Sequence, residues 1–115
     1  MSIVTMGTRT AEFLLSEAGG QRSREEITLA ITATALPAGQ VLGKVTATGH
    51  YVPYDAALEN GGETAAAVLY EAKEASDAVQ QAGAVVRDAE LIGSKLTDLD
   101  AAGTTDLAAV GLIVR

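Results

Sequence analysis

Residues 25–34 read EEITLAITAT. Ile27, Leu29 and Ile31 alternate with threonine and alanine, and the β-branched side chains among them favour an extended backbone. A period of two is typical of a strand that buries one face and exposes the other. This stretch therefore predicts a strand, and the rest of the chain follows with similar, shorter segments.

Five further segments are predicted to be extended, with turns between them. Pro37 and Gly39 predict the first turn, because proline fixes φ and glycine tolerates a positive φ. Gly43 lies inside the next expected strand and indicates a bulge or a close approach of another backbone. The expected extended segments are residues 41–47, 51–54, 64–70, 84–91 and 112–115.

The segments between them carry little helical pattern. Residues 55–63 are predicted to form a loop, and residues 71–81 fit either a loop or one or two exposed helical turns. Residues 104–106 (Thr-Thr-Asp) can cap a short helix over 107–110. Neither a repeat nor a regular alternation of strand and helix is visible, so the predicted fold class is mainly β with one or two short helices, α+β.

The composition predicts a thin hydrophobic core. The chain has 115 residues, which fits one domain, and 48% of them are apolar. However, 22 of these are alanine and only 3% of the chain is aromatic. A domain of this size buries only about two-thirds of the surface of its unfolded chain. Association with other copies, or with a larger assembly, would add stability.

Several classes of protein are disfavoured by composition. The chain has no cysteine and one histidine, which excludes disulfide frameworks, thiolate sites and a two-histidine mechanism. Its apolar runs are shorter than the ~20 residues that a membrane span needs, and its first residues do not resemble a secretory signal. A net charge of −7 disfavours binding to nucleic acid.

Charge divides the chain near Arg24. Residues 1–24 have a net charge of +1 and residues 25–115 one of −8. We therefore predict an N-terminal arm over residues 1–24 and a body over residues 25–115. The arm is either a frayed terminus or a segment that orders on a partner surface. Its apolar side chains are the candidates for such binding: Ile3, Val4, Phe13, Leu14 and Leu15.

The sequence contains no pattern that is typical of a catalytic or metal site. A phosphate-binding loop needs Gly-x-x-x-x-Gly-Lys-Ser/Thr before a helix, whereas Gly43 and Lys44 lie in an expected strand and Val45 follows them. His50 has no recognisable nucleophile to join. Residues 98–106 do not match a calcium loop, and the acidic residues of 55–77 are spread over expected loops. We therefore predict a protein that is not an enzyme and holds neither metal nor cofactor.

Residues 43–45, 51–55 and 63–69, in this order and spacing, resemble the head decoration proteins of tailed phages. Residues 87–91 and 111–115 resemble the penultimate and closing strands of that family. The resemblance covers residues 25–115, and residues 1–24 match its N-terminal arm in position and character. One departure lies at residues 92–96, which contain no aromatic residue where the best-known member has a Trp-Pro pair.

The resemblance implies a fold, a function and partners. The fold would be a small β-clip-like domain with an extended N-terminal arm. The protein would be a homotrimer that binds the major capsid protein at threefold sites, on the outer surface of the expanded capsid, and cements the head of the virion. It would bind neither nucleic acid nor membrane, and would be assembled in the host cytoplasm. The alternatives are a trimeric β-clip module that binds a small ligand or hydrolyses nucleotides, and a tail or fibre component.

Overall fold

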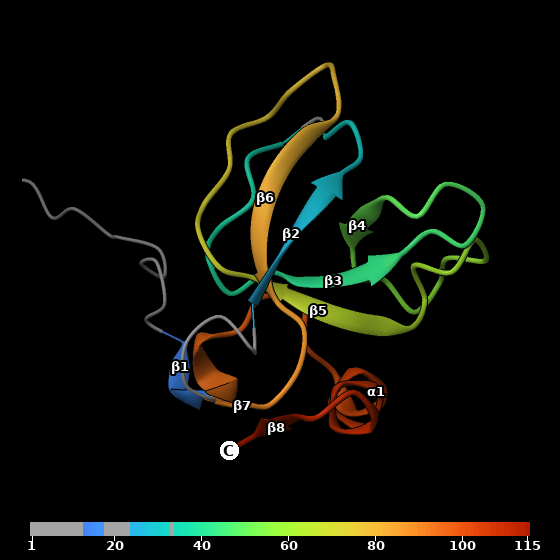
Figure 1. Ribbon diagram of the computed structural model, residues 1–115. Helices are drawn as coiled ribbons and strands as arrows, with labels where there is room; N and C mark the ends of the chain where they lie inside the picture. The colour runs from blue at the N-terminus through green and yellow to red at the C-terminus, as the bar shows by residue number, and fades with distance from the viewer. Residues whose placement is uncertain (1–12, 18–23, 33) are drawn as a thin grey trace, which may run out of the picture.

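The computed structural model describes residues 13–17, 24–32 and 34–115, which form two layers (Figure 1). Strands are the main regular element of the described residues, which also contain one α-helix and one 3-10 turn, so the predicted α+β class is confirmed. The β-clip type stays a prediction. The elements are β1 (Leu14–Glu17), β2 (Arg24–Leu29), β3 (Val41–Lys44), β4 (Tyr51–Pro53), β5 (Ala65–Leu69), β6 (Gln80–Val85), β7 (Ala89–Leu91), η1 (Gly93–Lys95), α1 (Ala101–Ala109) and β8 (Leu112–Val114).

The first layer is a closed barrel with the strand order β2-β4-β3-β5-β6. Its longest ladder joins β2 and β6 in antiparallel register, from Arg24 opposite Val85 to Leu29 opposite Gln80. The predicted alternation is confirmed at Ile27 and Leu29, whose side chains lie inside the barrel, but not at Ile31, which follows the end of β2 and is 63% exposed. This barrel core consists of Ile27, Leu29, Leu36, Leu42, Ala67, Leu69, Ala82 and Ala84.

The second layer is a three-stranded sheet, β1-β7-β8, with α1 beside it. It packs on the outside of the barrel and encloses a second core, the interlayer core. On β5, Val68 belongs to the interlayer core while Ala67 and Leu69 belong to the barrel core, so this strand is buried on both faces. The interlayer core consists of Phe13, Ala38, Val41, Tyr54, Ala65, Val68, Val85, Ala89, Leu91, Leu107 and Leu112.

The strands predicted around residues 27, 41, 51, 64 and 112 are confirmed, whereas the one over 84–91 is wrong in its limits. Two strands occupy this region, because the chain leaves β6 after Val85 and turns at Asp88, whose φ is +54°, before β7 begins. Residues 71–79 form a loop that two isolated bridges, Thr32–Ser76 and Leu36–Lys73, tie to the segment after β2.

The predicted helix cap at residues 104–106 is wrong. The helix begins at Ala101, and its N-cap is Asp100, whose carboxylate Oδ1 accepts a hydrogen bond of 2.7 Å from the Gly103 amide. Thr104 lies one turn further on and donates its hydroxyl hydrogen bond to the Asp100 carbonyl. The structure thus uses an aspartate that directly precedes a run of small residues.

Both features predicted at Gly43, a bulge and a close approach of another backbone, are present. The register between β3 and β5 shifts between Leu42 and Gly43, as at a bulge. A Cβ atom on Gly43 would lie 2.5 Å from the carbonyl oxygen of Gly62. The loop over residues 55–63 therefore packs its backbone directly onto β3, and glycine is needed at the point of contact.

Candidate functional site

The N-terminal candidates for partner binding occupy different environments. Phe13 is 0% exposed and lies in the interlayer core, and Leu14 is half-buried against the same core. Leu15 is 54% exposed, where the pairing of β1 with β7 is irregular between Leu14 and Ser16. Ile3 and Val4 lie outside the described residues. The structure thus brings Phe13 and Leu14 into the body and leaves Leu15 on its surface.

The outer face of the three-stranded sheet combines apolar side chains with one ion pair. Ile113 of β8 is 39% exposed and lies opposite Glu90 of β7. The Glu90 carboxylate accepts a hydrogen bond of 2.8 Å from Nε of Arg115. We call the face formed by Leu15, Glu90 and Ile113 the sheet face.

Both edges of this sheet are open in the part of the chain that the structure describes. β1 and β8 each pair only with β7 there, on its two sides. The unpaired N–H and C=O groups of an edge strand form a template for another strand. Extended segments of partner proteins commonly bind in this way, by hydrogen bonds between main chains.

The start of β1 and the end of the chain lie at the same end of the sheet, on either side of β7. The Ile92 amide donates to the Phe13 carbonyl over 2.7 Å, and the Gly93 amide donates to the Arg115 carbonyl over 3.1 Å. Phe13, the first described residue, therefore lies at the same end of the sheet as the C-terminal residue Arg115. Residues 92–96, the segment that departs from the family pattern, contribute Leu96 to the packing against the interlayer core, and Leu99 packs there just after it. Residues 92–99 add no aromatic side chain to this core.

A polar cluster joins α1 to the barrel. The Tyr54 hydroxyl donates a hydrogen bond of 2.8 Å to Asp100, and the Ala65 amide donates one of 3.1 Å to Asp106. Burial of the Tyr54 ring, together with its bond to Asp100, raises the pKa of Tyr54 to about 12. The hydrogen bonds from the Gly103 amide and from Tyr54 lower the pKa of Asp100. The Tyr54 hydroxyl, Asp100 and Asp106 all have partners within the protein, so the cluster explains how the helix is attached to the barrel.

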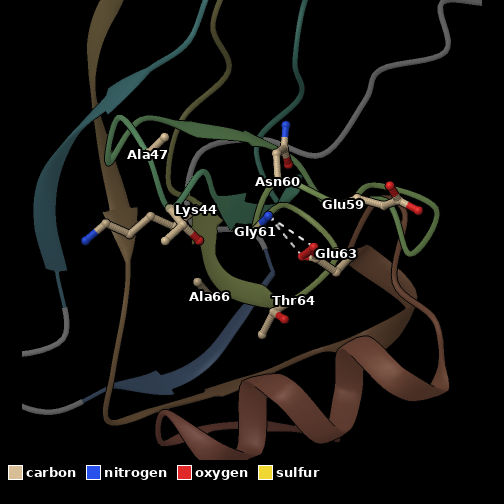
Figure 2. Close-up of a pocket in the computed structure, with 9 residues that line it drawn as sticks. Lys44, Ala47, Glu59, Asn60, Gly61, Glu63, Thr64 and Ala66 are labelled. Atoms are coloured by element: carbon tan, nitrogen blue, oxygen red, sulfur yellow. Dashed lines mark hydrogen bonds between the residues drawn. The ribbon is translucent and has the colours of Figure 1, made fainter.

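Two surface hollows lie beside charged side chains. One has a volume of about 680 Å³ and lies beside Lys44, between the turn after β3 and the loop that ends at Thr64 (Figure 2). In this hollow the Glu63 carboxylate turns back and accepts the Gly61 amide at 3.0 and 3.1 Å, so it is already used within the loop. The other, also about 680 Å³, lies beside Tyr54 and Asp100.

The residues considered as catalytic or metal-binding candidates are not brought together. Within residues 13–17, 24–32 and 34–115, no three histidine, cysteine or carboxylate side chains are placed to hold a metal ion. Lys44 ends a strand rather than beginning a helix, and the His50 backbone follows the turn after β3. Asp55 accepts the Ala57 amide over 2.9 Å and so stabilises the turn after Tyr54. No helix in these described ranges is long and apolar enough to cross a membrane.

Comparison with known proteins points to one family. The sequence model of the family "Bacteriophage lambda head decoration protein D" matches residues 3–112. The chain belongs to this family. A search of the curated proteins found no matching relative. Membership implies a protein associated with the phage capsid, a structural component of the virion, and confirms the resemblance seen in the sequence.

Two structural features of the site were missed by the sequence prediction. The first is β1, because a four-residue strand between glycine-containing stretches has no clear periodic signal. The second is the burial of Phe13, the one phenylalanine of the chain. A chain with so few aromatic residues has few large side chains with which to fill a core, and this scarcity is the signal that could have indicated it.

Proposed function

We propose that the protein binds as a homotrimer to the outer surface of the expanded phage capsid, at threefold sites formed by the major capsid protein, and stabilises the head. The observation that carries this proposal is the family match over residues 3–112, which includes both the body and most of the N-terminal segment. The small, alanine-rich core is consistent with a protein that gains stability from association.

The sheet face and the residues before Phe13 form the proposed capsid-binding surface. Leu15 provides exposed apolar area on the open edge strand β1, and Ile113 provides it on the opposite edge strand, β8. Ile3 and Val4, further along the same segment, would contact pockets on the capsid as the segment adds a strand. In this arrangement Phe13 and Leu14 hold the base of the arm in the body.

The energetics of one arm are modest. Burying an Ile, Val or Leu side chain contributes roughly 1.5–3 kcal/mol, and ordering the backbone costs about 1–2 kcal/mol for each residue. The net gain from one arm is therefore small. Three arms on one trimer bind with a high effective concentration, because the first contact holds the other two near their sites.

Two deletions distinguish the role of residues 2–12 from that of Phe13 and β1, which hold the arm to the body. Removing residues 2–12 should leave a folded body that decorates protein-free expanded capsids weakly, because Phe13 remains in the interlayer core. Removing residues 2–20 deletes Phe13 and β1 as well, and should also lower the stability of the body. Wild-type decoration by the protein that lacks residues 2–12, measured by co-sedimentation with capsids, would contradict the role of the arm.

Stabilisation of the capsid and the number of subunits bound at each site are measured separately. Decorated capsids should release DNA at a higher temperature than capsids without the protein, because bound subunits add contacts that must break before the shell opens. A density map of decorated capsids should show three subunits at each site. One or two subunits at each site would contradict the trimer, and equal release temperatures would contradict stabilisation.

A further inference from the structure

The loop over residues 55–63 contains the pair Asn60–Gly61, and Asn60 is the only asparagine of the chain. A glycine that follows an asparagine has no side chain to hinder its backbone nitrogen from attacking the asparagine side-chain carbonyl carbon. Asn60 is exposed and Gly61 is half-buried (Figure 2). The sequence therefore places the electrophile and the nucleophile of a deamidation reaction next to each other, within reach of water.

Deamidation at this pair needs no reagent other than water. The Gly61 nitrogen loses its proton and bonds to Cγ of Asn60, the bond from Cγ to the side-chain nitrogen breaks, and that nitrogen leaves with the proton as ammonia. The product is a succinimide ring. Water then opens the ring at either of its carbonyl carbons and leaves aspartate or isoaspartate. In isoaspartate the main chain runs through the former side chain and is one carbon longer.

The folded loop holds the nucleophile in its protonated form. The Gly61 amide donates to both carboxylate oxygens of Glu63, over 3.1 and 3.0 Å (Figure 2). A hydrogen bond from an amide to a carboxylate is stronger than one to a neutral acceptor. The negative charge of Glu63 also opposes the negative charge that develops on the nitrogen as its proton is lost. Glu63 therefore slows the attack by Gly61 in two ways.

The electrophile and the backbone around the pair are held as well. Oδ1 of Asn60 accepts the Gly62 amide over 3.0 Å, and the main-chain carbonyl of Asn60 accepts the Thr46 amide over 2.9 Å. Gly61 has a φ of +109°, and a Cβ atom on it would collide with the carbonyl oxygen of Lys44. The pair is thus packed against the end of β3 and the turn after it. Ring closure must bring Cγ of Asn60 into bonding distance of the Gly61 nitrogen, and these contacts resist that movement.

We propose that Asn60 is a latent deamidation site, and that Glu63 is the residue that keeps it latent in the folded protein. This role is independent of capsid binding. When the loop opens locally, the Gly61 amide leaves the Glu63 carboxylate, and the pair reacts as it does in an unfolded chain. The extra carbon of isoaspartate enters the main chain directly before Gly61 and Gly62, which pack closely on β3, so the loop loses its fit once the reaction has occurred.

The composition of the chain allows a direct test. There is no second asparagine, and none of the aspartates precedes a glycine, so isoaspartate formed in this chain is assigned to position 60 by peptide mapping. Wild-type protein and Glu63→Ala are incubated folded at slightly alkaline pH, and isoaspartate is measured over time by mass spectrometry and by enzymatic methylation. We expect Glu63→Ala to react at least about tenfold faster, because it loses a hydrogen bond to a charged group. In guanidinium chloride, which unfolds both chains, the two rates should be equal.

Two variants control for charge and for global stability. Glu59→Ala removes a carboxylate from the same loop, at a side chain that is exposed and extends away from the body. Leu91→Val weakens the interlayer core, outside the loop. Both should react at close to the wild-type rate, because neither change releases the Gly61 amide from Glu63 and the reaction requires only local opening.

Three results would overturn the proposal. If folded Glu63→Ala reacts no faster than the wild type, Glu63 does not protect the pair, and a slower reaction would identify it instead as a base that promotes the attack. If Leu91→Val accelerates the reaction as much as Glu63→Ala, the reaction requires global unfolding and Glu63 is not its specific restraint. If the unfolded chains form no isoaspartate, Asn60 is not a modification site.

Discussion

The two cores of this protein are built in different ways. The barrel core lies within residues 24–85, and all of its members except Leu36 lie in strands, where most of them alternate. The interlayer core joins side chains from residue 13 to residue 112, including one helix and three strands of the second layer. Local pattern therefore marks the strands of the barrel, although β2 and β6 pair from opposite ends of residues 24–85. β1 of the second layer has no such pattern and is placed by its pairing with β7 and by the burial of Phe13. The proposed capsid-binding surface lies on the second layer, so its order depends on the interlayer core.

The largest expected effect is that of Phe13→Ala. Removing a fully buried phenylalanine should lower the free energy of unfolding by about 3–5 kcal/mol, because it loses buried area and leaves a cavity. Urea denaturation gives the loss, and hydrogen exchange should show β7 and β8 losing protection before β2 and β6. The control is Leu15→Ala, at the exposed neighbour in β1, which should change stability by about 0.5 kcal/mol or less. A loss below about 1 kcal/mol for Phe13→Ala would show that the two cores are independent of the N-terminal segment.

A smaller loss is expected within the barrel from Gly43→Ala. The new Cβ would lie 2.5 Å from the Gly62 carbonyl oxygen, so the loop must move away from β3 at a cost of about 1–3 kcal/mol. Gly83→Ala in β6 is a matched control, because its Cβ would meet nothing closer than 3.8 Å. Equal stability of the two variants in urea would contradict the close approach. This outcome would also contradict the close backbone approach that the sequence predicts at Gly43.

The sequence predicted the barrel better than the second layer, for physical reasons. Alternation identified β2, and a glycine inside a strand identified the contact at Gly43. β1 could not be predicted, because its partner β7 lies more than 70 residues away and the intervening chain gives no sign of the pairing. The helix cap at Asp100 was missed because Gly103 occupies the position where a glutamate or glutamine would complete a capping box.

The attachment between the layers is tested by Tyr54→Phe. This change removes the hydrogen bond to Asp100 and should lower stability by about 0.5–1.5 kcal/mol at neutral pH. Because burial raises the pKa of Tyr54 from 10.0 to about 12, its contribution is complete below pH 10 and is lost as the pH rises toward 12. The wild-type protein should therefore lose stability over this range more steeply than Tyr54→Phe, as followed by thermal unfolding. Parallel curves for the two proteins would contradict a buried, neutral Tyr54.

The smallest effects are expected in the acidic side chains of the loop over residues 55–63, where Asp55 and Glu59 are exposed and Glu63 is half-buried. Glu59→Ala should change stability by about 0.5 kcal/mol or less, because Glu59 is exposed and extends away from the body. Asp55→Ala and Glu63→Ala should each cost slightly more, up to about 1 kcal/mol, since Asp55 accepts the Ala57 amide and Glu63 accepts the Gly61 amide. Decoration of capsids by all three variants should match that of the wild type, because the loop lies on the barrel and the proposed capsid-binding surface lies on the second layer. Loss of decoration by Glu59→Ala, in a protein that remains fully folded, would move the capsid contact onto the barrel and reverse the roles of the two layers.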